Sequence, residues 1–139
     1  MIRGLNHITL SVNDVEESFH FYVDILGCKP IQKNPISAYV LAGDTWLALD
    51  KSQNAHAAPA TDYSHVAFSV SLQDFAELKE RLLAYGITSW QENHTEGDSF
   101  YFLDPNGHKL ELATSNLANR IVEAKKAWGE EIIWYEEYS

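Results

Sequence analysis

The chain has 139 residues, 45% of them apolar, and its 20 acidic residues against 10 lysines and arginines give a formal net charge of −10. This composition excludes an intrinsically disordered chain, and the negative charge argues against nucleic acid and anionic membranes as partners. No apolar run approaches the roughly 20 residues of a membrane span, and we expect no signal peptide. The single cysteine, Cys28, excludes an internal disulfide and fits a reducing compartment, so we expect a cytoplasmic protein.

Two similar halves follow one another along the chain. Residues 6–12 and residues 64–70 both alternate between apolar and polar side chains, as half-buried strands do. His7 and His65 stand at the same position of the two repeats, on the polar face of each strand. The two strands are therefore predicted to be structurally equivalent.

A helix is predicted after each of these strands. Asn13-x-x-Glu16 and Ser71-x-x-Asp74 resemble capping boxes, which start helices. An apolar stripe at helical spacing follows each box, and a glycine is the expected stop. The stripes are Val15, Phe19, Tyr22, Val23 and Leu26 before Gly27, and Phe75, Leu78, Leu82 and Tyr85 before Gly86.

Each half then ends in strands that flank a turn. We predict strands over residues 38–41 and 46–49 around Gly43-Asp44, and over residues 100–103 and 109–112 around the turn sequence Asp-Pro-Asn-Gly. The sequence thus predicts an α+β fold in a single domain, residues 1–139. Its parts are a module of about residues 4–50, a module of about residues 62–113, and a C-terminal helix and tail over residues 114–139.

The polar faces of the predicted strands indicate a metal site. Aligning the repeats puts Glu111 opposite Ala48, on the face of the two histidines if the sheets curl around a common cleft. Two imidazoles and a carboxylate suit Mn, Fe, Ni, Zn or Co better than Mg or Ca, and three ligands leave positions open for a substrate. Each residue alone would more often be structural or surface-exposed, so the prediction of His7, His65 and Glu111 depends on their combination.

Three segments resemble one enzyme superfamily. They are residues 4–10 (GLNHITL), 62–68 (DYSHVAF) and 96–111 (EGDSFYFLDPNGHKLE). They are similar to the vicinal oxygen chelate superfamily and, more closely, to its fosfomycin-resistance glutathione transferases. The resemblance implies paired βαβββ modules with curved mixed sheets around a metal cleft. It also implies a Mn²⁺-dependent transferase that opens the epoxide of fosfomycin with the glutathione thiol and so confers antibiotic resistance.

The resemblance also implies roles for individual residues. His7, His65 and Glu111 would hold the metal, and Thr9 would hydrogen-bond the epoxide oxygen as the ring opens. Tyr39, a second catalytic candidate, and Trp46 would lie on the side of the thiol. Further contacts to the substrate would come from Tyr63, Gln91, Thr95, Tyr101 and Arg120.

A potassium ion and a second copy of the chain complete what the resemblance implies. Asn93, Thr95, Gly97 and Ser99 match the positions of a potassium-binding loop in the family, although the loop composition alone favours an ordinary polar loop. Family members are homodimers with shared metal sites. His7 would accordingly come from one chain, and His65 and Glu111 from the other.

Two departures from the family pattern bear on the substrate. Gln91 stands where a lysine that contacts the phosphonate is expected, and His94 stands where an arginine is expected. A charged hydrogen bond is worth roughly 1.5–3 kcal/mol, so these changes weaken the expected affinity for fosfomycin. The sequence leaves open which divalent metal is bound, which thiol is the donor, and whether a related anionic epoxide is the natural substrate.

Other functions fit parts of the same pattern. A two-His-one-Glu set is also the ligand set of non-heme Fe(II) ring-cleaving dioxygenases. A glyoxalase-like isomerase is less consistent with the sequence, because Ala48 stands at the position of its fourth ligand. A drug-binding protein without turnover would generally lack the metal triad, and a structural homodimer with a vestigial site is a further alternative.

Overall fold

The structure is a computed structural model that describes residues 1–55, 58–94 and 97–135. These residues form two four-stranded mixed sheets with flanking helices, which confirms the predicted α+β class. The first module comprises β1 (His7–Val12), α1 (Val15–His20), the π-helix η1 (Phe21–Ile25), β2 (Lys29–Asn34), β3 (Ser37–Ala42) and β4 (Thr45–Lys51). The second comprises β5 (Val66–Ser69), α2 (Leu72–Tyr85), β6 (Ser89–Gln91), β7 (Ser99–Leu103) and β8 (Lys109–Ala113), and α3 (Leu117–Ala127) follows it.

The two sheets have the same topology. Their strand orders are β1-β4-β3-β2 and β5-β8-β7-β6, with the β1–β4 and β5–β8 pairs parallel and the others antiparallel. In the first sheet Ala48 lies between Thr9 and Tyr39; in the second, Glu111 lies between Ala67 and Tyr101. The register therefore makes Ala48 and Glu111 equivalent, as the repeat alignment predicts.

Two strands of the structure have no counterpart among the strands predicted from alternation, although the βαβββ modules that the resemblance implies include them. The first, β2, is an edge strand whose side chains are mostly exposed, so it has no apolar face to alternate with a polar one. The second, β6, is three residues long and contains a register shift. Alternation detects strands that bury one face over several residues, and neither of these does.

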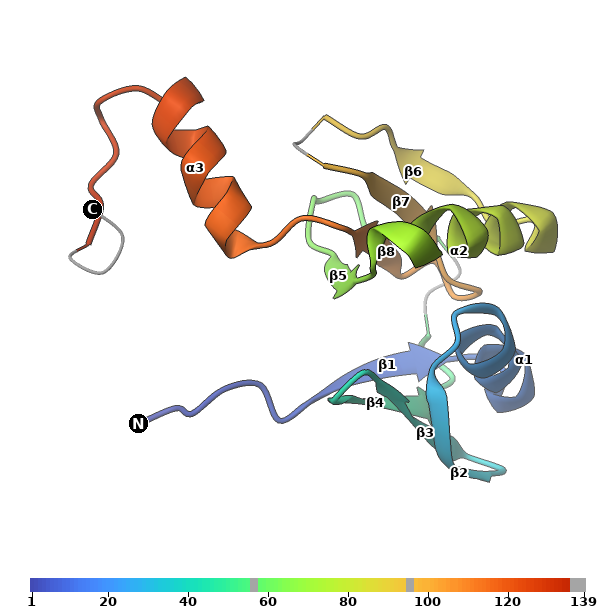
Figure 1. Ribbon diagram of the computed structural model, residues 1–139. Helices are drawn as coiled ribbons and strands as arrows, with labels where there is room; N and C mark the ends of the chain where they lie inside the picture. Colours follow the sequence, from blue (N-terminus) through green and yellow to red (C-terminus); the bar gives the residue numbers. More distant parts are fainter. Residues whose placement is uncertain (56–57, 95–96, 136–139) are drawn as a thin grey trace.

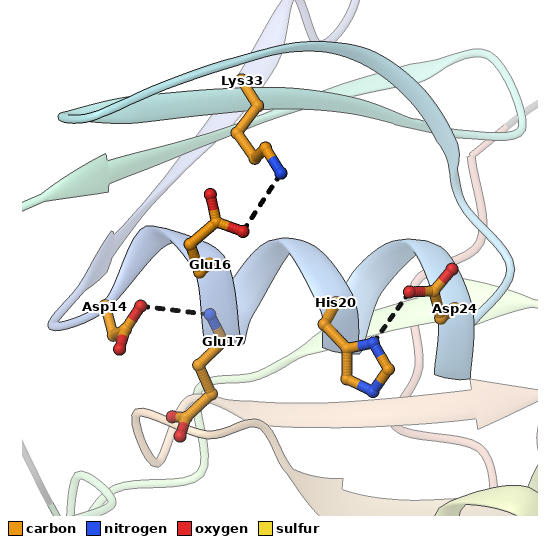
Figure 2. Close-up of polar contacts among 6 residues, drawn as sticks. All are labelled: Asp14, Glu16, Glu17, His20, Asp24 and Lys33. Carbon is orange, nitrogen blue, oxygen red and sulfur yellow. Dashed lines mark hydrogen bonds and ion pairs between the residues drawn. The ribbon is translucent and has the colours of Figure 1, made fainter.

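The start of α1 differs from the prediction by one residue. Its N-cap is Asp14 and not Asn13: the Asp14 carboxylate accepts a hydrogen bond from the Glu17 N–H at 3.2 Å, as Figure 2 shows. The Glu16 side chain instead pairs with Lys33 on β2 at 3.1 Å. The helix continues as η1, where Asp24 lies 2.7 Å from His20 Nδ1.

The start and end of α2 agree with the prediction. The Ser71 hydroxyl accepts a hydrogen bond from the Asp74 N–H at 3.1 Å. The helix ends at Gly86, which has a φ of 94°. Only glycine adopts this left-handed conformation at no steric cost, which explains the stop.

Side chains of both modules form one buried cluster. Helix α2 packs against η1, and the Phe21 and Phe102 rings approach to 6.4 Å between centroids. In Figure 1 the two modules lie one above the other, with α1 and α2 on the same side. The most buried members are Val12, Phe21, Tyr22, Ala38, Val40, Leu47, Leu49, Leu82, Phe102 and Leu110.

A buried hydrogen bond also joins the modules. The Tyr22 hydroxyl of η1 donates to the Asp104 carboxylate at 2.7 Å, and both side chains are buried. The other Asp104 oxygen accepts from the N–H groups of Asn106 and His108. His108 Nε2 in turn lies 2.8 Å from the Ser11 carbonyl at the end of β1. The turn over residues 104–107 is therefore held against the first module.

Two segments, the N-terminal arm and α3, extend from the two packed modules. In Figure 1 the N-terminal arm runs away from β1, and α3 stands apart from both sheets. Both carry exposed apolar side chains: Met1, Ile2 and Leu5 on the arm, and Leu117, Val122 and Trp128 on or directly after α3. None of the helices in the described residues combines the length and apolarity that crossing a membrane requires.

Candidate functional site

The site is centred on His65 and Glu111 of the second sheet. His65 directly precedes β5, and Glu111 lies on the neighbouring strand β8. The His65 Nε2 atom lies 2.9 Å from Glu111 Oε1, and only 18% and 11% of the two side chains are exposed. The structure thus brings together two of the three residues predicted to bind a metal.

Hydrogen bonds fix the orientation of the His65 ring. Its Nδ1 lies 2.8 Å from the Tyr63 carbonyl oxygen. A carbonyl only accepts, so Nδ1 carries a proton and Nε2 is the nitrogen turned toward Glu111. Metal-binding histidines are usually oriented in this way, with one ring nitrogen donating to an oxygen and the other left for the metal.

The pair fits a divalent transition metal. Two ligand atoms that each lie about 2.1 Å from one ion would be about 3.0 Å apart in an octahedral site and about 3.4 Å apart in a tetrahedral one. The observed separation of Nε2 and Oε1 is 2.9 Å. An imidazole nitrogen with a carboxylate oxygen also suits Mn, Fe, Co, Ni or Zn in chemical type.

His7 has a similar ring orientation on the other sheet. Its Nδ1 lies 2.7 Å from Asn6 Oδ1, and its ring packs on Trp46 at 4.4 Å between centroids. In the described part of a single chain, no three His, Cys, Asp or Glu side chains come close enough to hold a metal. One chain therefore does not unite His7 with His65 and Glu111.

The polar face of the first sheet carries the residues predicted to meet the thiol and the epoxide. Thr9 is exposed next to buried Ala48, and Tyr39 and Trp46 are half-buried with their rings 5.1 Å apart. The Trp46 indole N–H is buried and has no hydrogen-bond partner among the described residues. Thr9, Tyr39 and Trp46 thus share the sheet face of His7.

An aromatic cluster surrounds His65 on the second sheet. Tyr63, Trp90 and Tyr101 lie with ring centroids 4.9, 5.3 and 6.0 Å from the His65 ring. The sequence predicts Tyr63 and Tyr101 at the site. It does not identify Trp90, whose position at a register shift of β6 breaks the alternation on which the prediction depends.

Gln91 interacts with the aromatic cluster. Its side-chain N–H donates to the Tyr63 hydroxyl at 3.2 Å, and its strand partner is Tyr101. Gln91 therefore lies at the edge of the site, where the resemblance expects a lysine. His94 is exposed in the loop that follows.

The predicted potassium loop is described in part. The Asn93 side chain donates to the Gly97 carbonyl at 2.9 Å, and Ser99 is buried at the start of β7. Thr95 lies outside the described residues. Arg120 is half-buried on α3, the helix that stands apart from both sheets in Figure 1.

Two buried groups away from this cluster have raised pKa values. Burial, with a further contribution from the charge of Asp104, raises the pKa of Tyr22 well above 10. Burial also raises the pKa of the Cys28 thiol to about 11. Cys28 is therefore a neutral thiol at physiological pH, which argues against a nucleophilic role for it.

A sequence profile of the Glyoxalase/Bleomycin resistance protein/Dioxygenase superfamily matches residues 4–112. The chain belongs to this superfamily. The match covers both modules, and the predicted resemblance to the vicinal oxygen chelate superfamily is confirmed.

Relatives within the superfamily are similar along nearly the whole chain. The glutathione transferase FosA of Serratia marcescens is 41% identical over 128 residues, which are 91% of each chain. The metallothiol transferase FosB of Staphylococcus haemolyticus is 38% identical over 132 residues, 91% of this chain and 94% of the relative.

Solved structures of superfamily members agree with the fold. The fosfomycin resistance protein FosX of Listeria monocytogenes, complexed with Mn(II) and a sulfate ion, is 28% identical and has a TM-score of 0.78. The match covers 88% of this chain and 98% of FosX. FosX of Mesorhizobium loti gives a TM-score of 0.71 at 27% identity and covers 88% and 99% of the two chains.

Proposed function

We propose that this protein is a metal-dependent thiol transferase that opens the epoxide of fosfomycin or of a related anionic epoxide. The observation that carries the proposal is the His65–Glu111 pair, with the ring nitrogen Nε2 turned toward the carboxylate. Relatives named as glutathione and metallothiol transferases, similar over 91% of the chain, support the same chemistry.

His65 and Glu111, with His7 of a second chain, would hold a divalent metal, for which Mn²⁺ is our choice because a similar FosX binds Mn(II). When bound, the metal supplies a Lewis acid to the epoxide oxygen. Thr9 shares a sheet face with His7, and its hydroxyl is our candidate to donate a hydrogen bond to the oxygen that gains charge as the ring opens.

The thiol would approach along the first sheet. Tyr39 and Trp46 form a half-buried aromatic pair on the face of Thr9. The Tyr39 hydroxyl is our candidate for orienting the thiol sulfur, and the Trp46 N–H, unpartnered among the described residues, can donate to an acceptor of the incoming molecule. Glutathione is our first choice of donor because the FosA relative is named for it.

The phosphonate would bind at the second sheet. Tyr101 lies in the aromatic cluster, and Gln91 can donate a neutral hydrogen bond where the family pattern has a charged one. Arg120 is our candidate for a bidentate contact to the anion, with Thr95 as a further contact. Asn93, Thr95, Gly97 and Ser99 remain our candidates for a potassium ion that would add positive charge nearby.

We also propose a homodimer. In the described part of the chain β1, which begins with His7, and β5, which directly follows His65, are both sheet edges. The N-terminal arm and the α3 region expose apolar side chains such as Leu5, Leu117 and Trp128. A second copy could cover these surfaces and bring its His7 to the His65–Glu111 pair. We assign the protein to the cytoplasm, where low-molecular-weight thiols stay reduced.

The experiment must distinguish thiol addition from water addition. A FosX structure contains 1S,2S-dihydroxypropylphosphonic acid, the diol that water addition to fosfomycin would give. We would follow fosfomycin by ³¹P NMR with protein, Mn²⁺ and K⁺, in parallel samples with glutathione, with cysteine and without thiol.

A thioether signal only in the thiol samples would support the transferase and identify the donor. A diol signal in every sample would replace the transferase with a hydrolase on the same site. No reaction by a protein that binds Mn²⁺ would refute fosfomycin as the substrate. A superfamily alternative, ring cleavage of a catechol, would then be examined by Fe(II)-dependent oxygen uptake.

A further inference from the structure

Trp90 contacts the His65 ring and the backbone directly before Glu111. Its indole ring lies 5.3 Å from the His65 ring between centroids. Its Nε1–H donates to the carbonyl of Leu110, the residue directly before Glu111, at 3.0 Å. One side chain thus packs on the first residue of the pair and anchors the backbone that carries the second.

The backbone of β6 explains how Trp90 reaches this position. Ser89 pairs with Phe102, whereas Gln91 pairs with Tyr101, so two steps along β6 match one step along β7. Such a bulge inserts one extra residue and redirects a side chain. The redirected indole packs edge-on against Tyr101 at 5.1 Å.

Other contacts hold the indole itself. The Tyr63 ring lies 5.8 Å away, and the Lys109 ammonium lies 5.1 Å above the indole. The same ammonium donates a hydrogen bond to the Asp62 carbonyl. Trp90 therefore connects the segment before β5 with β6, β7 and β8, which together carry the pair.

We propose that Trp90 is a positioning residue for the metal pair: it keeps the His65 ring and the Glu111 backbone in the geometry that the ion needs. This inference rests on the metal site of the proposed function. Groups that orient metal ligands change metal affinity about 10- to 100-fold when they are removed. A residue that only fills space would change stability without this effect.

The test compares variants of the full-length protein. Trp90→Leu removes the ring contacts and the N–H, whereas Trp90→Phe removes the N–H and retains a smaller aromatic ring. Phe100→Leu is the matched control, because Phe100 is 7% exposed on β7, and its neighbour Tyr101 lies on the opposite face, toward the pair. Mn²⁺ affinity is measured by titration with EPR detection of free Mn²⁺, alongside the melting temperature of each variant.

We expect Trp90→Leu to weaken Mn²⁺ binding about 10- to 100-fold. The Mn²⁺ affinity of Trp90→Phe should lie between those of Trp90→Leu and the wild type. Phe100→Leu should lower the melting temperature and leave the affinity unchanged. Wild-type affinity in Trp90→Leu, or an equal loss in Phe100→Leu, would overturn the inference. If Trp90→Leu does not fold, an unchanged affinity in Trp90→Phe overturns it, because the N–H to Leu110 is then not needed.

A measurement on metal-free protein separates this inference from the proposed function. The order parameter of the His65 ring, from ¹³C relaxation at Cε1, should fall in Trp90→Leu and stay unchanged in Phe100→Leu. If the wild type binds no Mn²⁺, the metal site is refuted. The ring order then decides whether Trp90 positions His65: an equally ordered ring in Trp90→Leu would refute that role.

Discussion

Tyr22→Phe tests the hydrogen bond that joins the two modules. The Tyr22 hydroxyl donates to Asp104 at 2.7 Å, and the two residues are 0% and 5% exposed. A hydrogen bond to a charged group contributes about 1.5–3 kcal/mol, and among the described residues the carboxylate keeps two backbone donors when the hydroxyl is removed. We expect the free energy of unfolding to fall by about 2 kcal/mol.

Urea denaturation followed by circular dichroism measures this loss. With a slope of about 2 kcal/mol per molar urea, the midpoint should fall by about 1 M with the slope unchanged. Tyr85→Phe is the control, because Tyr85 is 40% exposed and its hydroxyl makes no hydrogen bond within the described residues. A loss below about 0.5 kcal/mol, or no larger than that of the control, would refute the role assigned to Tyr22.

The same variant should change the alkaline pH dependence. Burial raises the pKa of folded Tyr22 well above 10, whereas the unfolded side chain ionises near 10. The unfolded state therefore releases a proton that the folded state retains, and stability falls as the pH rises above about 10. Above this pH, the free energy of unfolding should decrease less steeply with pH in Tyr22→Phe than in the wild type. An equal decrease in the two proteins would contradict the assignment.

Four further predictions concern the metal and substrate site, the potassium loop and the Cys28 thiol. Glu111→Ala should abolish stoichiometric Mn²⁺ binding, measured by calorimetry, because the two remaining imidazoles, one from each chain, cannot replace the carboxylate. A variant that still binds the metal would exclude Glu111 as a ligand. Gln91→Lys should tighten fosfomycin binding about 10- to 100-fold in a titration, since it restores a charged donor worth about 1.5–3 kcal/mol, and an unchanged Kd would mean that residue 91 does not face the phosphonate. Potassium should raise the turnover rate relative to sodium at equal ionic strength, whereas equal rates would leave residues 93–99 an ordinary loop. Cys28→Ala should remove a stability loss that the wild type shows as the pH rises from about 9 to about 11, because the unfolded thiol ionises near 9.0 and the folded one near 11; urea midpoints across this range provide the check.

The repeat and its alternation were sufficient to predict most of the fold. A strand with one buried face must place equivalent residues on the same side, so the polar positions of residues 6–12 and 64–70 follow from the amino-acid sequence alone. The same rule assigned Glu111 to the strand face of the histidines, and in the structure its Oε1 lies 2.9 Å from His65 Nε2. It could not identify β2, because an exposed edge strand has no apolar face.

Trp90 and the Tyr22–Asp104 hydrogen bond could not be predicted for a different reason. Trp90 reaches the site through a bulge, which shifts the register by one residue and reverses the face that alternation assigns. Tyr22 and Asp104 are 82 residues apart and meet only because η1 packs against the turn of the other module. Neither a local pattern nor a repeat alignment contains that information.

The unequal sharing of ligands between the modules has a consequence for assembly. Register makes His7 equivalent to His65 and Ala48 equivalent to Glu111, so the first sheet offers one ligand and the second sheet two. The single chain keeps these sets apart in the described residues. If a second copy unites them, as we propose, the ion binds the dimer more tightly than either separated chain. Metal binding and chain association then stabilise each other by mass action, and a variant that weakens the pair, such as Trp90→Leu, weakens the dimer as well.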